Sequence, residues 1–251
     1  MASPRVGVQL IVFGERPQTD LKGVLVDVAS AEYDGFEGGG VPSPEEEARV
    51  RSAMEGLPLD FIGGHYGINQ LADLEAVEQS ARHICALGGE FMMVSGRYDT
   101  LEGYREGVAI LNQAGERCRR AEVTLCYHNH NWELEKIDGT VPLDLLLQET
   151  DADLVKLCPD IYWLHVGGQS PPEFLRRHGA RCPCIHFKDG LAGDQIREFR
   201  ELGRGNIEVA ETLEAALEIE PKWIIVEQDA TKRHPAESVR ISREYLQSLG
   251  L

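Results

Sequence analysis

The chain has 251 residues, of which 42% are hydrophobic, and this length suits one domain with a large buried core. Its 42 acidic residues outnumber its 25 basic ones, and the formal net charge of −17 repels phosphate backbones and anionic lipids, so we expect neither nucleic acid nor a membrane as a partner. No apolar run approaches the roughly 20 residues that span a bilayer, and the first residues show no signal-peptide core, so we expect a cytosolic protein.

Strand-like and helix-like segments alternate along the chain, which is typical of βα units around a parallel sheet. One helix start is well marked, because Ser43 is a good N-cap and is followed by Pro44 and by acidic residues. The predicted strands cover residues 5–12, 34–38, 58–64, 91–95, 123–128, 154–158, 183–187 and 222–227. The predicted helices cover residues 20–31, 44–55, 70–87, 100–120, 142–150, 171–177, 208–218 and 235–249.

Eight strands that alternate with helices favour a (β/α)8 TIM barrel, an α/β fold, formed as a single domain over residues 1–251. The alternative, an open doubly wound sheet, predicts a glycine-rich phosphate turn after the first strand, where this chain has only Gly14. In a barrel the carboxyl ends of all strands open onto one rim. Polar residues that follow different strands are therefore expected to converge there.

The six cysteines are scattered through the chain, apart from the close pair Cys182 and Cys184. None has the spacing of a zinc knuckle or of a redox pair. We therefore interpret all of them as reduced packing residues, most of them buried.

Potential metal ligands stand at the ends of the last four predicted strands. A single His or Asp after a strand is more often a turn former or a satisfied polar group. Four such residues on one rim instead favour a divalent cation with open positions for a substrate. The candidates are Glu133 or His128, Asp160, His186 and Glu227.

Several longer motifs surround these candidates. They are Tyr33-Asp34-Gly35-Phe36-Glu37, Tyr127-His128-Asn129-His130 with Trp132-Glu133, Asp160-Ile161-Tyr162-Trp163, His186-Phe187-Lys188-Asp189, Leu202-Gly203-Arg204-Gly205 and Trp223-Ile224-Ile225-Val226-Glu227-Gln228-Asp229. With these motifs, in this order and spacing, the chain resembles the xylose-isomerase-like TIM-barrel superfamily over nearly its whole length. This sugar-phosphate isomerase/epimerase group includes inosose dehydratases and hydroxypyruvate isomerases.

The resemblance implies one divalent ion, commonly manganese, magnesium, cobalt or zinc, held by Glu, Asp, His and Glu from the last four strands. Asp160, His186 and Glu227 match the last three positions. Many relatives carry Glu at the end of the fifth strand, where this chain has His128, and Glu133 follows in the loop. We predict Glu133 as the ligand, with His128 as its rival, and favour manganese. The apurinic endonuclease branch has a larger zinc set and a basic surface, which the net charge of −17 argues against.

A metal bound to adjacent carbonyl and hydroxyl oxygens acidifies the neighbouring C–H bond, so a nearby base can form an enediolate. We predict His130 as the proton carrier, because an imidazole can accept and donate a proton at neutral pH. The alternative is that His130 only orients a ligand. Lys188 can neutralise enolate charge, or can simply pair with a rim carboxylate. Glu37 and His65, at the second and third strand ends, are further candidates for proton transfer or hydroxyl binding.

The remaining predicted pocket residues are substrate-binding candidates. Trp163 and His165 can wall the pocket, although Trp163 can equally be core packing. His128 joins them if Glu133 is the ligand. Arg204, like Arg97, is a loop cation that can grip a phosphate, but no glycine-rich phosphate cradle is evident, so we expect an unphosphorylated sugar or cyclitol.

These observations predict a metal-dependent isomerase or epimerase that acts on a keto sugar or a related polyol. A lyase is the close alternative, either a dehydratase of the inosose type or an enzyme that cleaves 3-keto-glycosides by β-elimination. Epimerases of this superfamily typically pair two Glu residues across the substrate, and His128 and His130 replace part of that arrangement. A third hypothesis is a non-catalytic barrel that requires a partner subunit, and a homo-oligomer is also compatible with the sequence.

Overall fold

Eight parallel strands form the centre of the computed structural model, which describes residues 3–193 and 197–251. The strands are β1 (Arg5–Gln9), β2 (Gly35–Gly39), β3 (Asp60–Gly67), β4 (Phe91–Ser95), β5 (Thr124–His128), β6 (Val155–Cys158), β7 (Cys184–Phe187) and β10 (Trp223–Val226). They follow the order β6-β5-β4-β3-β2-β1-β10-β7, and a parallel bridge between Asp160 and His186 joins the two ends of this order. The predicted TIM barrel is therefore confirmed, with a seam between β6 and β7.

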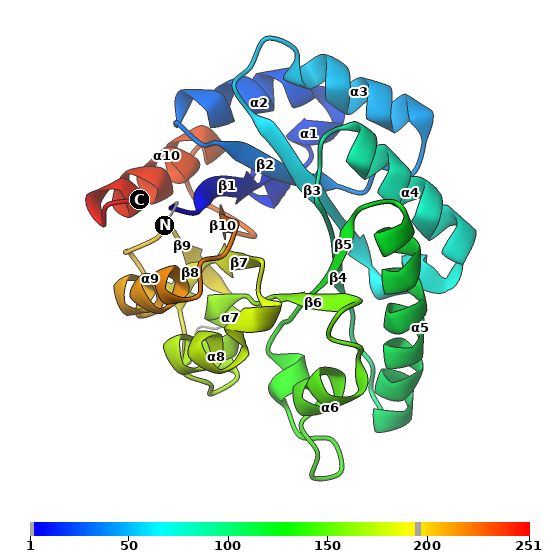
Figure 1. Ribbon diagram of the computed structural model, residues 1–251. Helices are drawn as coiled ribbons and strands as arrows, with labels where there is room; N and C mark the ends of the chain where they lie inside the picture. Colours follow the sequence, from blue (N-terminus) through cyan, green and yellow to red (C-terminus); the bar gives the residue numbers. More distant parts are fainter. Residues whose placement is uncertain (1–2, 194–196) are drawn as a thin grey trace.

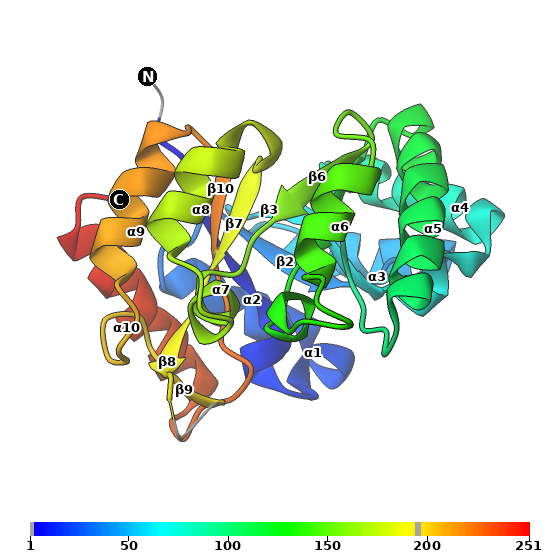
Figure 2. The same cartoon turned by 90° about the horizontal axis from the view of Figure 1, so that it is seen from below.

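Helices pack around the outside of the barrel, as Figures 1 and 2 show. Several begin at side chains that accept a hydrogen bond from a backbone N–H of the first turn, among them Ser43, Asp73 and Thr100. Each predicted helix is present, with small differences at its ends. The long helices are α2 (Leu21–Ser30), α3 (Pro44–Met54), α4 (Leu74–Ala86), α5 (Leu101–Arg120), α6 (Pro142–Glu149), α8 (Pro171–His178), α9 (Val209–Glu218) and α10 (Pro235–Ser248).

Several short elements differ from the prediction, most of them at the carboxyl rim. The first strand ends at Gln9 and not at residue 12, because the Gln9 side chain accepts a hydrogen bond from the N–H of Ile11 and a 3-10 turn begins there. A hairpin follows β7, and in Figure 2 it lies at the same end of the barrel as α1. The added elements are η1 (Leu10–Phe13), α1 (Arg16–Thr19), η2 (Ile68–Ala72), η3 (Trp132–Leu134), α7 (Ile161–Val166), η4 (Gly179–Arg181), β8 (Asp189–Leu191) and β9 (Glu198–Arg200).

The interior of the barrel is filled by its own small cluster of side chains. Alternate residues of a strand point to opposite faces, so on β4 Phe91 and Met93 face inward while Met92 and Val94 pack against the helices. The inner cluster comprises Ile62, Phe91, Met93, Cys126, Cys158, Cys184, Trp223 and Ile225. The cysteines are free thiols, as predicted, and all except Cys85 are buried. Residues two positions further along these strands face the same way and form the layer at the carboxyl rim.

Candidate metal centre and active site

Four potential metal ligands meet in this rim layer. One donor atom from each of His128, Asp160, His186 and Glu227 lies within 4.8 Å of the others, and all four residues are buried. They stand at the carboxyl ends of β5, β6, β7 and β10, two residues beyond Cys126, Cys158, Cys184 and Ile225 respectively. The structure thus brings together three of the four ligands predicted from the sequence.

Glu133, the fourth predicted ligand, lies elsewhere. It belongs to η3, and its carboxylate accepts hydrogen bonds of 2.8 Å from the Tyr127 hydroxyl and from the backbone N–H of His130. Burial raises the pKa of this carboxyl to about 7. The 3-10 turn directs Glu133 back toward β5, so its rival His128 completes the group of four.

The donor set fits a divalent cation. His128 Nδ1 is buried and has no hydrogen-bond partner within the described part of the chain, whereas Asp160 Oδ2 faces the ammonium of Lys188 at 3.2 Å. An unpaired buried nitrogen is costly unless a ligand satisfies it. The backbone N–H of Asp160 is held at 3.1 Å by the side chain of Asn129, a supporting residue that the sequence did not single out. Two imidazoles and two carboxylates suit manganese, cobalt or zinc better than magnesium, which prefers oxygen ligands.

His186 lies between two carboxylates. Its Nε2 is 2.6 Å from Glu37 Oε2, and its Nδ1 contacts Glu227. Burial alone would lower the pKa of His186, but the charges of Glu37 and Glu227 outweigh burial and raise the pKa well above its usual value. Burial likewise raises the pKa of Glu37, and the neighbouring imidazoles outweigh it, so Glu37 remains ionised. An ionised Glu37 can fix the orientation of the His186 ring.

Glu37 also holds the more exposed His65. His65 Nδ1 is 3.1 Å from Glu37 Oε1, its Nε2 is 3.0 Å from Ser95 Oγ, and 21% of its side chain is exposed. Because Glu37 is ionised and can only accept, Nδ1 is the donor in this pair. The ring centroid of His65 is 5.2 Å from that of His128, so His65 lies beside the candidate metal centre. Ser95 was not predicted as a site residue.

Lys188 is buried among three carboxylates. Its ammonium lies 3.2 Å from Asp160, 3.0 Å from Glu227 and 2.8 Å from Asp229, and it stands 5.2 Å from the ring centroid of Trp163. Burial lowers the pKa of Lys188, but the three carboxylates outweigh burial and raise it, so the group is a fixed cation. Asp229 was not among the predicted site residues, although it lies two residues beyond Glu227 on the same strand end.

His130 is half-buried and lies against Trp132. Its ring stacks on Trp132 at 4.0 Å between centroids, with 11° between the planes. Burial, with a smaller contribution from the charge of Lys188, lowers the pKa of His130 to about 3. These surroundings favour the neutral imidazole, and the role of His130 as the proton carrier stays a prediction.

The other predicted pocket residues divide into two groups. Trp163 is buried beside Lys188 and His130, as a wall of the site. His165, near the end of α7, makes no ring hydrogen bond to a residue that the structure describes, and Arg204 is exposed in the loop before α9. The structure does not bring either His165 or Arg204 into the group of four donors.

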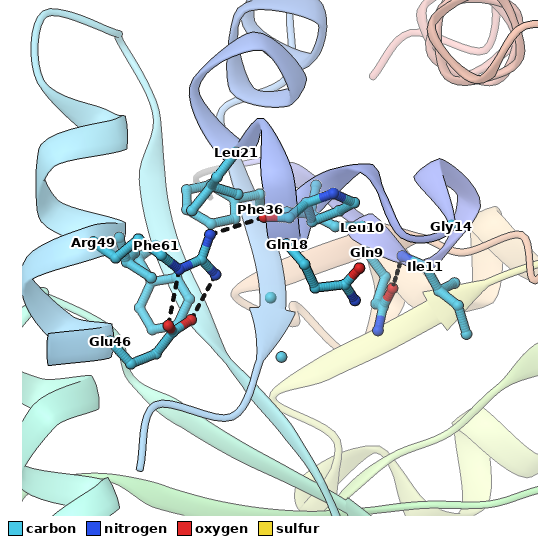
Figure 3. A pocket seen from close by; sticks show the side chains of 14 residues that line it. Gln9, Leu10, Ile11, Gly14, Gln18, Leu21, Phe36, Glu46, Arg49 and Phe61 are labelled. Carbon is cyan, nitrogen blue, oxygen red and sulfur yellow. Dashed lines mark hydrogen bonds and ion pairs between the residues drawn. The ribbon is translucent and has the colours of Figure 1, made fainter. Parts of the chain in front are cut away.

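A cavity of about 230 Å³ opens over the carboxyl ends of β1 and β2, and none of the four donors lines it. Figure 3 shows the amide side chains of Gln9 and Gln18 in this cavity and the ion pair of Arg49 with Glu46 on its wall. Gln9, which lines the cavity, is the register partner of Glu37 on the neighbouring strand. The cavity therefore lies one strand away from the carboxylate that contacts His186.

Comparison with known proteins identifies the family. The family model described as xylose isomerase-like TIM barrel matches residues 25–249. The chain belongs to this family. The resemblance predicted from the motifs is thereby confirmed. In the described residues, no helix of this family member is long and apolar enough to cross a membrane.

Two inosose dehydratases are similar to this xylose isomerase-like barrel in sequence. The protein from Lacticaseibacillus casei is 31% identical over 154 residues, which represent 54% of this chain and 51% of that protein. The protein from Halalkalibacterium halodurans is 27% identical over 266 aligned residues, 90% of this chain and 86% of that protein. The match thus spans about half the length of the first relative and most of the second.

Solved structures of this family share the fold. A sugar phosphate isomerase/epimerase from Parabacteroides distasonis superimposes with a TM-score of 0.80 at 24% identity, over 99% of this chain and 95% of that chain. An IolI protein with a bound zinc atom gives a TM-score of 0.74 at 12% identity, over 98% and 97% of the two chains. At these identities the likeness establishes the barrel fold alone.

Proposed function

We propose that this protein is a metal-dependent enzyme that removes a proton next to the carbonyl of a keto sugar or a cyclitol ketone. The observation that carries the proposal is the convergence of His128, Asp160, His186 and Glu227 within 4.8 Å at the carboxyl rim. The family supports it, because its curated relatives and structural neighbours include inosose dehydratases and sugar epimerases. A cytosolic location and a small-molecule substrate remain part of this proposal.

These four residues would hold one divalent ion, with manganese favoured and cobalt or zinc suited to the same donors. When bound, the ion polarises the substrate carbonyl and acidifies the adjacent C–H bond. All four donors come from one chain, so the proposed ion needs no ligand from a partner subunit. The enzymes among the relatives favour an enzyme over the non-catalytic barrel.

The chain's own groups would divide the remaining work. His65, with its Nδ1 hydrogen-bonded to Glu37, would present Nε2 as the base once the substrate displaces Ser95 and brings its C–H bond to this nitrogen. Lys188 is a fixed cation whose charge can stabilise the negative charge that grows on a substrate oxygen. Glu37 positions both His65 and His186, because one of its carboxylate oxygens contacts each imidazole.

Two outcomes can follow proton removal. Return of the proton to the neighbouring carbon, or to the opposite face, gives isomerisation or epimerisation. Loss of a β-hydroxyl or β-alkoxyl group gives dehydration or glycoside cleavage. The imidazole of His128 in the fifth-strand position, together with the inosose dehydratase relatives, favours this second candidate, a lyase.

Solvent deuterium exchange tests the proposal. The purified protein is loaded with Mn²⁺ and incubated in D₂O with ketohexoses, inososes and 3-keto-glucosides, and deuterium incorporation and products are followed by NMR and mass spectrometry. We expect exchange that depends on metal, with an unsaturated product if the enzyme is a lyase. Absence of exchange with every member of these three classes, in protein shown to contain metal, would contradict the proposal.

A further inference from the structure

Three buried thiols lie in the barrel directly beneath the four donors. Cys126, Cys158 and Cys184 each precede one of the proposed site residues by two positions and face inward with it. The Cys184 side chain belongs to the same buried inner cluster as those of Cys126 and Cys158. All three are fully buried, so a layer of sulfur adjoins the layer of nitrogen and oxygen donors.

Cys158 is within reach of both imidazoles of the metal centre. One donor atom from each of His128, Cys158 and His186 lies within 4.8 Å of the others. The buried Nδ1 of His128 has no hydrogen-bond partner in the described residues. Around a tetrahedral ion, with bonds of about 2.0–2.3 Å, such donors stand roughly 3.3–3.7 Å apart. Side-chain shifts of about 1 Å would therefore bring them onto one ion.

We propose that His128, Cys158 and His186 form a second position for a divalent ion, deeper in the barrel, that thiophilic ions such as cadmium occupy. This second position shares the imidazoles of His128 and His186 with the proposed metal centre, and only in this respect does the inference rest on the proposed function. Because they are shared, the two positions are alternatives for a single ion. Manganese would take the position with the Asp160 and Glu227 carboxylates, whereas cadmium would bond to the Cys158 thiolate, and the thiol proton would leave to solvent.

Cadmium absorption tests the proposal on the reduced, metal-free full-length protein under argon. Thiolate bound to cadmium gives a charge-transfer band in the ultraviolet, which is measured as Cd²⁺ is added to one equivalent. We expect the band in the wild type and its loss in Cys158→Ala. The matched control is Cys118→Ala, which removes an equally buried thiol that contacts Met92 outside the barrel interior, and which should retain the band.

Two results would overturn the assignment. One is a wild type that binds one equivalent of cadmium without the band, and the other is a band that persists in Cys158→Ala. If Cys158→Ala does not fold, Cys158→Ser replaces it. X-ray absorption on the cadmium-loaded wild type also counts the sulfur neighbours of the ion directly. One sulfur neighbour supports the proposal, and the absence of any sulfur neighbour overturns it. Failure of the proposed function is separate, because it appears as missing Mn²⁺ binding or missing deuterium exchange in the wild type, whatever cadmium does.

Discussion

At the scale of single residues, the fifth-strand position sets the chemistry of the proposed metal centre. An imidazole in place of a carboxylate leaves two anionic ligands, whose charges balance that of a divalent ion within the set of four donors. Donor type then matters more than net attraction for the choice of metal, and nitrogen donors favour later transition metals.

His128→Ala and Glu133→Gln form a matched pair that tests this position. We expect His128→Ala to lower the affinity for Mn²⁺ by about a hundredfold, because it removes a ligand and not merely a hydrogen bond that supports a ligand. Glu133→Gln should retain the affinity, since its amide can still accept from the His130 N–H and can donate to Tyr127. Isothermal titration with Mn²⁺ measures both. The reverse pattern would return Glu133 to the role first predicted for it.

Proton transfer is expected to depend on His65 more than on His130. His65→Asn keeps a polar group but removes the base, so turnover should fall by about 10² to 10⁴ with metal still bound. His130→Asn should reduce turnover by less than about tenfold, because its pKa of about 3 excludes it from holding a proton. Rates of deuterium exchange and metal content are measured on both proteins. Equal large losses would show that His130 also takes part.

The buried carboxyl of Glu133 should make stability depend on pH. Its pKa is raised from 4.5 to about 7 in the folded protein, so between these values the folded state binds more protons than the unfolded state. Stability therefore falls as pH rises through this window, by up to about 3 kcal/mol at about 1.4 kcal/mol per pKa unit. Glu133→Gln should show a smaller loss between pH 5 and 8 in urea denaturation of the metal-free protein. Identical slopes in both proteins would refute this assignment.

These residues also show what the sequence could and could not predict. Asp160, His186 and Glu227 follow strands whose direction is fixed by the barrel, so their convergence is readable from strand ends alone. The choice between His128 and Glu133 depends on a 3-10 turn that directs Glu133 toward Tyr127, and no local pattern announces that turn.

At the scale of elements, the barrel strands and long helices were predictable because their periods and caps are local signals. The hairpin β8–β9 was not, because its strands are short and their register depends on contacts with distant residues. Asp189 is the main such contact. Its carboxylate accepts hydrogen bonds from the backbone N–H groups of Gly190 at 2.7 Å, Gly205 at 2.9 Å and Ile207 at 3.3 Å, which ties the hairpin to the loop before α9.

Asp189→Asn should loosen this connection. An amide cannot accept all three bonds and turns an N–H group toward a donor, so we expect a loss of about 1–3 kcal/mol in the free energy of unfolding. Metal stoichiometry should not change, because Asp189 is outside the group of four donors. Asp99→Asn, at a side chain that is 90% exposed, is the control and should be close to wild type. Urea denaturation with Mn²⁺ present measures both, and equal stability of the two variants would contradict the anchoring role.

At the scale of the whole molecule, the seam of the barrel and the proposed metal site coincide. β6 and β7 meet at the bridge between Asp160 and His186, and these same two residues are proposed ligands of one ion. An ion bound there would join the two ends of the sheet directly. At this seam β6 and β7 lie side by side but are not joined by a continuous ladder of backbone hydrogen bonds. We therefore expect the barrel to open most easily there.

Removing the metal should therefore destabilise the protein, and most of all at the seam. A ligand that binds only the folded state stabilises it by about 2.7 kcal/mol at a hundredfold excess over its dissociation constant, so the melting temperature should fall with a chelator and return with Mn²⁺. Hydrogen exchange should increase first at β6 and β7, because their bridge loses the ion that spans it, while β3 and β4, which lie far from the seam in the sheet order, should keep their protection. An unchanged melting temperature after verified metal loss would contradict a site that spans four strands. Uniform loss of protection would leave the site in place but would show that the ion stabilises the barrel as a whole and not its seam.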